Sequence, residues 1–230
     1  PKEYTHQELI SQQVITSPAA TSTEDMQIKW EDQATTYTYN IQSTVHTQTN
    51  LAKVYQEQTF PITNTEQTEY TLATEFIDIN DDIEEKAQEL SAGETDLYKV
   101  VFKLAEWTEE NIEYNLSTIA AETVEPSSWV LENKRGVCDE LTNLYISFCR
   151  SLGIPARFIS GIAYTNIIND FGPHGWAEVY IDGQWIPMDI AYGQFGWVDA
   201  THIKFNELTD PNQASANFEW SGLNFAIEPG

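Results

Sequence analysis

Three residues with side chains suited to nucleophilic catalysis lie in the second half of the chain: Cys138, His174 and Asp189. A thiol can attack a carbonyl carbon when a neighbouring imidazole takes its proton and a carboxylate orients that imidazole. Cys138 opens a segment with helical periodicity, and the dipole and free N–H groups at a helix start favour the thiolate. On its own, this cysteine could equally be a small buried apolar residue.

The helix that Cys138 starts is the clearest element in the sequence. Apolar residues recur at helical spacing and predict one buried face of a helix over 138–152: Leu141, Leu144, Tyr145, Phe148, Cys149 and Leu152. Gly153 is a typical C-terminal cap, and Pro155 prevents continuation. Cys149 lies in the middle of the stripe, so we expect it in the core. Its distance from Cys138 along one helix, about 16 Å, excludes a disulfide between them.

A hairpin is predicted to orient His174. Two alternating segments, 174–181 and 184–190, flank Asp182-Gly183, a strong signal for a two-residue turn. Such a turn pairs Ile181 with Gln184 and places His174 diagonally beside Asp189, on one face. Taken singly, the histidine could be a surface residue and the aspartate a strand-end cap.

Several other residues receive an expectation from the same patterns. Three aromatic residues share the predicted His174 face and are candidates for a substrate wall: Trp176, Tyr180 and Trp185. The remaining histidines lie in polar contexts without obvious partners, so we expect them to be solvated: His6, His46 and His202. No Cys or His cluster indicates a metal site, and no cofactor is expected.

The rest of the chain predicts an α+β protein. Residues 1–25 are rich in Ser, Thr and Gln and suggest an arm or linker, while alternation in 26–80, including Tyr70, Leu72 and Phe76, predicts a small β-domain. Helical periodicity begins near Asp81 and is strong over 95–112. Later strands are expected at 156–162, 202–205 and 218–227, so 81–230 forms the candidate catalytic domain.

Composition limits the partners. A formal charge of −25 would repel nucleic acid and anionic membranes, and no apolar run approaches a membrane span. The polar, lysine-poor N-terminal region suits an extracellular or cell-surface protein, although a cytoplasmic location stays open. Because the chain does not start with Met, we expect a processed or trimmed form. Oligomeric state and calcium dependence are left open.

Four ordered motifs resemble the transglutaminase-like superfamily, over about residues 75–205. They are Arg135-Gly-Val-Cys-Asp-Glu-Leu, Arg150-Ser-Leu-Gly-Ile-Pro-Ala-Arg, His174-Gly-Trp-Ala-Glu-Val-Tyr and Trp185-Ile-Pro-Met-Asp189. The resemblance implies a papain-like core, in which the nucleophile helix packs on an antiparallel sheet. It implies Cys138 as nucleophile, His174 as general base and then acid, and Asp189 as the orienting group. Gly175 departs from the alanine usual after the histidine.

The resemblance also implies a thioester mechanism on a protein or peptide substrate. The family's oxyanion is held partly by the nucleophile's own N–H and partly by an upstream donor, for which Trp129 is the candidate. We expect a cysteine protease or amidase. A cross-linking protein-glutamine gamma-glutamyltransferase is the first alternative, and a catalytically silent surface binding module is the second.

Overall fold

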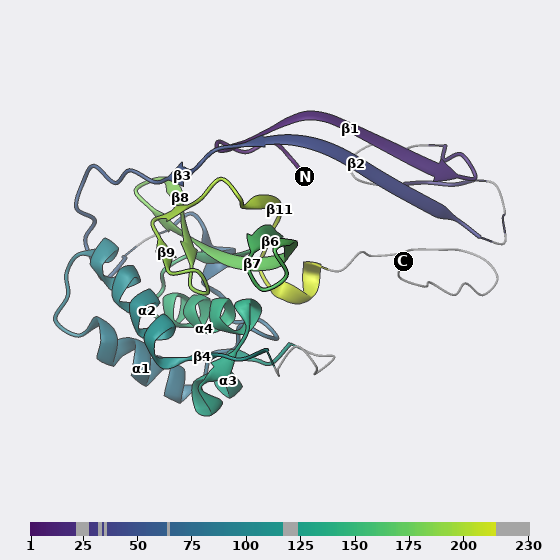
Figure 1. Cartoon of the computed structure of the whole chain (residues 1–230). Coiled ribbons are helices and arrows are strands. Elements are labelled where there is room, and N and C mark those ends of the chain that lie inside the picture. Colours follow the sequence, from purple (N-terminus) through teal and green to yellow (C-terminus); the bar gives the residue numbers. More distant parts are fainter. Residues whose placement is uncertain (22–27, 32–33, 35, 64, 117–123, 215–230) are drawn as a thin grey trace.

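Four helices and a five-stranded antiparallel sheet form the body of the protein (Figure 1). The computed structural model describes residues 1–21, 28–31, 34, 36–63, 65–116 and 124–214. The helices are α1 (Asp81–Ser91), α2 (Leu97–Asn111), α3 (Ser127–Asn133) and α4 (Cys138–Ser151). The order of strands across the sheet is β11-β6-β7-β8-β9. The α+β prediction is therefore confirmed.

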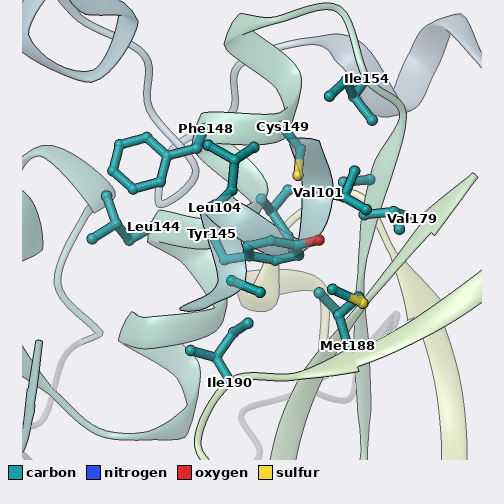
Figure 2. Close-up of a cluster of buried hydrophobic side chains, with 14 of the residues drawn as sticks. Val101, Leu104, Leu144, Tyr145, Phe148, Cys149, Ile154, Val179, Met188 and Ile190 are labelled. Carbon is teal, nitrogen blue, oxygen red and sulfur yellow. The ribbon is translucent and has the colours of Figure 1, made fainter. Parts of the chain in front are cut away.

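Helix α4 lies at the centre, between the sheet and the other three helices. Its predicted stripe is buried, but its other faces are largely buried as well, because α1, α2 and α3 cover them. Gly153 ends the helix in a left-handed conformation (φ 73°), as expected for a C-terminal glycine. Figure 2 shows the core on this side, where Cys149 is completely buried near Tyr145 and Val179. Both cysteines are free thiols.

Helices α1 and α2 begin at polar caps. The side chain of Asn80 accepts a hydrogen bond from the Ile83 N–H at 3.0 Å, and Asp96 accepts from the Tyr98 N–H at 3.0 Å. These bonds satisfy N–H groups that have no partner within the first helical turn. Among the described residues, no helix is both long enough and apolar enough to cross a membrane.

The predicted hairpin has the predicted register. Asp182 and Gly183 both have positive φ (54° and 76°), and Ile181 pairs with Gln184. The sheet strands are β6 (Ala156–Thr165), β7 (Asp170–Ile181), β8 (Gln184–Asp189), β9 (Gln194–Phe195) and β11 (Ile203–Leu208). Strand β7 starts four residues earlier than predicted. It includes Pro173, which is tolerated because β7 there pairs with β6 alone.

A long two-stranded hairpin projects from this body (Figure 1). It consists of β1 (Gln7–Ser17) and β2 (Thr38–Thr47), so part of the region predicted as an arm or linker is a strand. At its base, the Gln7 side chain donates to the Lys204 carbonyl at 2.9 Å and accepts from the Lys204 N–H at 2.8 Å. The boundaries between an arm, a β-domain and a catalytic domain stay a prediction.

The strand predicted around residues 70–76 is wrong. Residues Thr68–Thr71 form a short 3-10 helix, η1, and the chain after it makes no ladder. Instead, the Phe76 N–H donates to Asp210 at 2.9 Å, and the Phe76 carbonyl accepts from the Ser127 N–H at 3.0 Å. These non-local bonds replace strand pairing, which a short alternating pattern cannot anticipate.

Five short elements complete the described chain. Strand β3 (Asn50–Leu51) pairs with β10 (Trp197–Val198), and η3 (Pro211–Ala214) follows β11. Strand β4 (Glu113–Tyr114) pairs in parallel with β5 (Arg135–Gly136), immediately before α4. The predicted strand at 218–227 lies outside the described residues.

Candidate active site

His174 and Asp189 are hydrogen-bonded across the hairpin face. The Nε2 of His174 lies 2.7 Å from Oδ2 of Asp189, and the two side chains are 4% and 0% exposed. Asp189 also accepts the backbone N–H of Tyr192 at 3.1 Å. Burial alone would raise the pKa of Asp189, but His174 and a second histidine, His202, outweigh it and lower the pKa to about 2. The carboxylate is therefore ionised, and the predicted His–Asp geometry is present.

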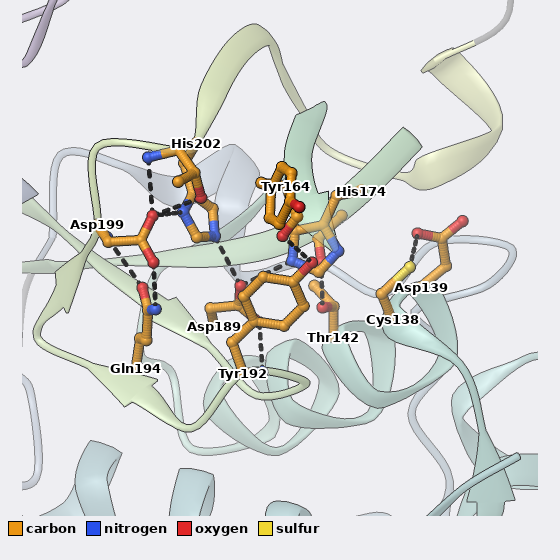
Figure 3. A network of polar contacts seen from close by, with 12 residues as sticks. Cys138, Asp139, Thr142, Tyr164, His174, Asp189, Tyr192, Gln194, Asp199 and His202 are labelled. Atoms are coloured by element: carbon orange, nitrogen blue, oxygen red, sulfur yellow. Dashed lines mark hydrogen bonds and ion pairs between the residues drawn. The ribbon is translucent and has the colours of Figure 1, made fainter. Parts of the chain in front are cut away.

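This bond fixes the tautomer of His174. Because an ionised carboxylate only accepts hydrogen bonds, Nε2 of His174 carries the hydrogen. Nδ1 is then the nitrogen with a free lone pair when the ring is neutral. In Figure 3 this edge of the His174 ring faces the side on which Cys138 lies. A proton acceptor is thus directed toward the thiol.

Cys138 is the first residue of α4 and is partly exposed. Its thiol donates to Oδ1 of Asp139 at 3.5 Å. Burial of the sulfur raises the pKa of the Cys138 thiol, and the Asp139 carboxylate adds to this, while a backbone hydrogen bond from Gly175 acts in the opposite direction. Burial and the neighbouring negative charge thus act against the thiolate that the helix start was expected to favour.

Gly175 is required by close packing beside the thiol. A Cβ added there would lie 2.5 Å from Oδ1 of Asp139 and 2.5 Å from Cζ of Phe158. The carbonyl of Gly175 also accepts a hydrogen bond from Thr142 on α4 at 3.2 Å. An alanine at position 175 would therefore collide with the Asp139 carboxylate, which packs against the sheet at this point.

The aromatic environment of His174 differs from the predicted wall. Tyr192 stacks on the imidazole with ring centroids 4.5 Å apart and remains partly exposed. Trp176 is also stacked, at 6.0 Å, but is 1% exposed and offers little surface to a substrate. Tyr192 was not among the proposed wall residues; its N–H bond to Asp189 brings the ring over the site.

Tyr180 and Trp185 lie at the turn end of the hairpin instead. They pair with each other across the strands, six residues from His174 along β7, which is roughly 20 Å. The guanidinium of Arg157 covers the Trp185 ring at 3.9 Å. The structure therefore does not bring these two wall candidates to Cys138.

His202 is the main site residue that the sequence analysis misjudged. It was expected to be solvated, yet it is completely buried, with Nε2 2.9 Å from Oδ2 of Asp189 and Nδ1 3.2 Å from Oδ1 of Asp199. The short segment that joins β10 to β11 brings it there, and local sequence carries little sign of this contact. His6 is also buried, contrary to expectation, whereas His46 is exposed.

Ligand-type atoms of His174, Asp189 and His202 lie within 4.8 Å of one another. Both imidazoles already point Nε2 at the same carboxylate oxygen. A metal ion would have to replace both of these hydrogens, so hydrogen bonding accounts for the cluster without a metal.

Two side chains are candidates to assist the oxyanion. Trp129 lies half-buried on α3, with the Arg135 guanidinium 5.5 Å from its ring, and its role stays a prediction. The β4–β5 pairing places Tyr114 opposite Gly136, two residues before Cys138, and the backbone N–H of Cys138 faces the Tyr114 hydroxyl. Burial raises the pKa of Tyr114, so the hydroxyl is a neutral group at physiological pH.

Comparisons with known proteins agree with this geometry. Residues 84–190 match the Transglutaminase-like superfamily, a range that includes Cys138, His174 and Asp189 but ends before His202. The uncharacterized protein YebA of Bacillus subtilis (strain 168) is 26% identical over 146 residues, which cover 54% of this chain. The match spans about a fifth (20%) of the length of YebA.

The crystal structure of a candidate cysteine protease from Cytophaga hutchinsonii has a similar fold. It superposes with a TM-score of 0.66 and 22% identity, covering 93% of this chain and 75% of that one. A more distant neighbour is the periplasmic domain of TgpA from Pseudomonas aeruginosa, with a TM-score of 0.45 and 15% identity, covering 78% of this chain and 63% of that one. The helix start, the hairpin and the family match agree, and the core at residues 84–190 matches the transglutaminase-like superfamily.

Proposed function

We propose that the chain is a thiol acyl-transfer enzyme that hydrolyses peptide or carboxamide bonds through a thioester at Cys138. The observation that carries the proposal is the 2.7 Å bond from His174 Nε2 to Asp189, which leaves Nδ1 directed toward the thiol (Figure 3). Cys138, His174 and Asp189 thus correspond to a nucleophile, a base and an orienting carboxylate.

In the first half-reaction the thiol proton moves from Sγ of Cys138 to Nδ1 of His174 as sulfur attacks the carbonyl carbon. A tetrahedral intermediate forms, with its negative charge on the former carbonyl oxygen. When the intermediate collapses, the C–N bond breaks and the leaving amine or ammonia takes the proton from His174. The acyl group remains on sulfur as a thioester.

In the second half-reaction His174 takes a proton from water, and the oxygen of that water attacks the thioester carbon. Breaking the C–S bond returns the proton to sulfur and releases a carboxylic acid. Asp189 stays ionised throughout and stabilises the imidazolium that forms twice in the cycle. If an amine attacks in place of water, the product is an amide, which is the transglutaminase outcome.

The oxyanion is proposed to be held by the backbone N–H of Cys138 and by one side-chain donor. Tyr114 faces that N–H, and Trp129 is the donor proposed from the family resemblance. Loss of one such donor typically lowers kcat about 100- to 1000-fold. Tyr114→Phe and Trp129→Phe therefore distinguish the two donors. The kcat of each variant is compared with that of the wild type, after its folding has been shown to be unchanged.

Hydrolysis is favoured over amine transfer by the surroundings of the thioester. A transferase needs walls that exclude water while admitting an amine. Of the three proposed aromatic walls, Trp176 is buried behind His174, and Tyr180 and Trp185 lie at the far end of the hairpin. Tyr192 remains as the exposed aromatic stacked on His174. With so little apolar wall, water should outcompete an amine at low amine concentration.

One experiment tests the reaction class. Peptide libraries containing glutamine are incubated with the protein at neutral pH, with and without a labelled primary amine, and Cys138 is examined by mass spectrometry. We expect a thioester at Cys138 and mainly acid or cleavage products. Dominant incorporation of the amine would instead identify a transglutaminase. Cys138→Ala is the control and should give no adduct.

A catalytically silent binding module is the remaining alternative. It predicts that neither thiol reacts quickly with iodoacetamide at any pH between 6 and 9. An enzyme predicts pH-dependent alkylation of Cys138 with Cys149 unmodified, because Cys149 is completely buried.

A further inference from the structure

The carboxylate of Asp189 serves two imidazoles, and the second of them has a carboxylate on each side. His202 directs Nε2 to Asp189 at 2.9 Å and Nδ1 to Asp199 at 3.2 Å (Figure 3). The ring is 0% exposed, so no water competes for either nitrogen. This arrangement extends the proposed triad by two residues, both beyond the part of the chain that matches the family.

Both flanking carboxylates are ionised. Asp199 accepts the Thr201 N–H and the Gln194 side-chain amide, each at 2.8 Å, in addition to His202. Although burial acts to raise the pKa of Asp199, these donors lower it to about 2, the same value as for Asp189. Because ionised carboxylates only accept, both ring nitrogens of His202 must carry hydrogens, and the ring is an imidazolium.

The ionised carboxylates of Asp189 and Asp199 balance this imidazolium from both sides. The rings of His174 and Tyr192 lie 5.6 and 5.5 Å away, and burial raises the pKa of Tyr192 and keeps its hydroxyl neutral. Burial lowers the pKa of His6, which is the next histidine to sense the charge. Lys204, further along β11, is paired with Glu178 at 2.8 Å.

We propose that His202 is a charged positioning residue, which holds the Asp189 carboxylate in place for His174. This inference rests on the proposed function. Both rings direct Nε2 to Oδ2 of Asp189, and their centroids lie 5.6 Å apart. His202 holds one side of the Asp189 carboxylate, so that carboxylate cannot rotate away from His174.

The charge of His202 is tested directly by NMR. The chain has four histidines, so ring ¹⁵N labelling with long-range ¹H–¹⁵N spectra gives a small set of signals, and His202→Gln assigns the one of interest. We expect both nitrogens of His202 to remain protonated up to pH 8. A single protonated nitrogen at pH 7 would overturn the proposal, whatever the activity of the enzyme.

The effect on the site is tested by the pH profile of Cys138 alkylation with iodoacetamide. His202→Gln removes the charge that holds Asp189 and should shift the midpoint by about one pH unit, which is about a tenfold change in rate below it. Asp199→Ala, which leaves Nδ1 of His202 without its acceptor, should shift the midpoint as well and covers the case in which His202→Gln fails to fold. His46→Gln, at an exposed position, is the matched control.

The outcomes separate the two proposals. Wild-type midpoints in both variants, with only lower stability, would show that His202 is structural and overturn the inference. If Cys138 in the wild type is inert at every pH while the NMR spectra show a charged His202, the proposed function fails and the charge assignment stands.

Discussion

The carboxylate of Asp139 accepts the thiol of Cys138 at 3.5 Å, so a negative charge lies beside the proposed nucleophile. Asp139→Asn removes that charge and should favour the thiolate. We expect the midpoint pH of Cys138 alkylation to fall by about one unit, so that the rate below the midpoint rises about tenfold. Asp82→Asn, at an exposed position in the first turn of α1, is the control. An unchanged midpoint would contradict this electrostatic effect of Asp139 on the thiol.

Gly175→Ala should lose activity and stability together. The added Cβ would lie 2.5 Å from both Asp139 and the buried ring of Phe158, so the strand that carries His174 must shift. We expect a loss of about 1–3 kcal/mol in the free energy of unfolding. Denaturant titration and kcat measure the two effects.

The control for this substitution is in the same strand. Gly172→Ala places its Cβ 3.5 Å from Ile168, which is ordinary contact, and should be close to neutral. Equal losses in the two variants would show that the strand needs glycine for its backbone rather than for the space beside Asp139.

The two cysteines should separate activity from stability. Cys138→Ala removes the proposed nucleophile from a partly exposed helix start, so turnover should vanish with little change in the unfolding free energy. Cys149→Ser puts a hydroxyl in the completely buried core and should cost about 1–3 kcal/mol while activity remains. Thermal unfolding and peptide turnover measure both. Loss of turnover in Cys149→Ser at a temperature where it is folded would contradict the assignment of roles.

Asp189 should make the protein acid-sensitive in a defined window. Its pKa is lowered from 3.8 to about 2 in the folded state, so the carboxylate stabilises the fold above about pH 4. That contribution, on the order of 2 kcal/mol, is lost as the pH falls from about 4 to about 2. The free energy of unfolding, measured across this range, should decrease as the pH falls. Asp189→Asn should make this dependence on pH weaker and should lower the stability at pH 7.

Local sequence patterns predicted the parts of the site that depend on neighbouring residues. The Asp182-Gly183 turn set the hairpin register, and that register alone places His174 beside Asp189. The helical stripe likewise located the start of α4 and the burial of Cys149. Periodicity and turn chemistry act over short distances, so they can be read without the tertiary structure.

Contacts between distant segments could not be predicted in this way. His202 reaches Asp189 because β11 lies on the edge of the sheet and the segment before it turns inward. The pKa of the Cys138 thiol is raised by burial and by Asp139, which packs beside it. The segment near Phe76 is held by Asp210 and Ser127 rather than by strand pairing. Each of these results from packing that a single sequence does not reveal.

The contact between Gln7 and Lys204 has a consequence for solubility. Strand β11 is an edge strand, and its unpaired backbone groups could template pairing with another chain. The Gln7 amide occupies both the N–H and the carbonyl of Lys204, so it closes one rung of that edge as a neighbouring strand would. The base of the projecting hairpin therefore blocks this rung of the five-stranded sheet from pairing with another chain.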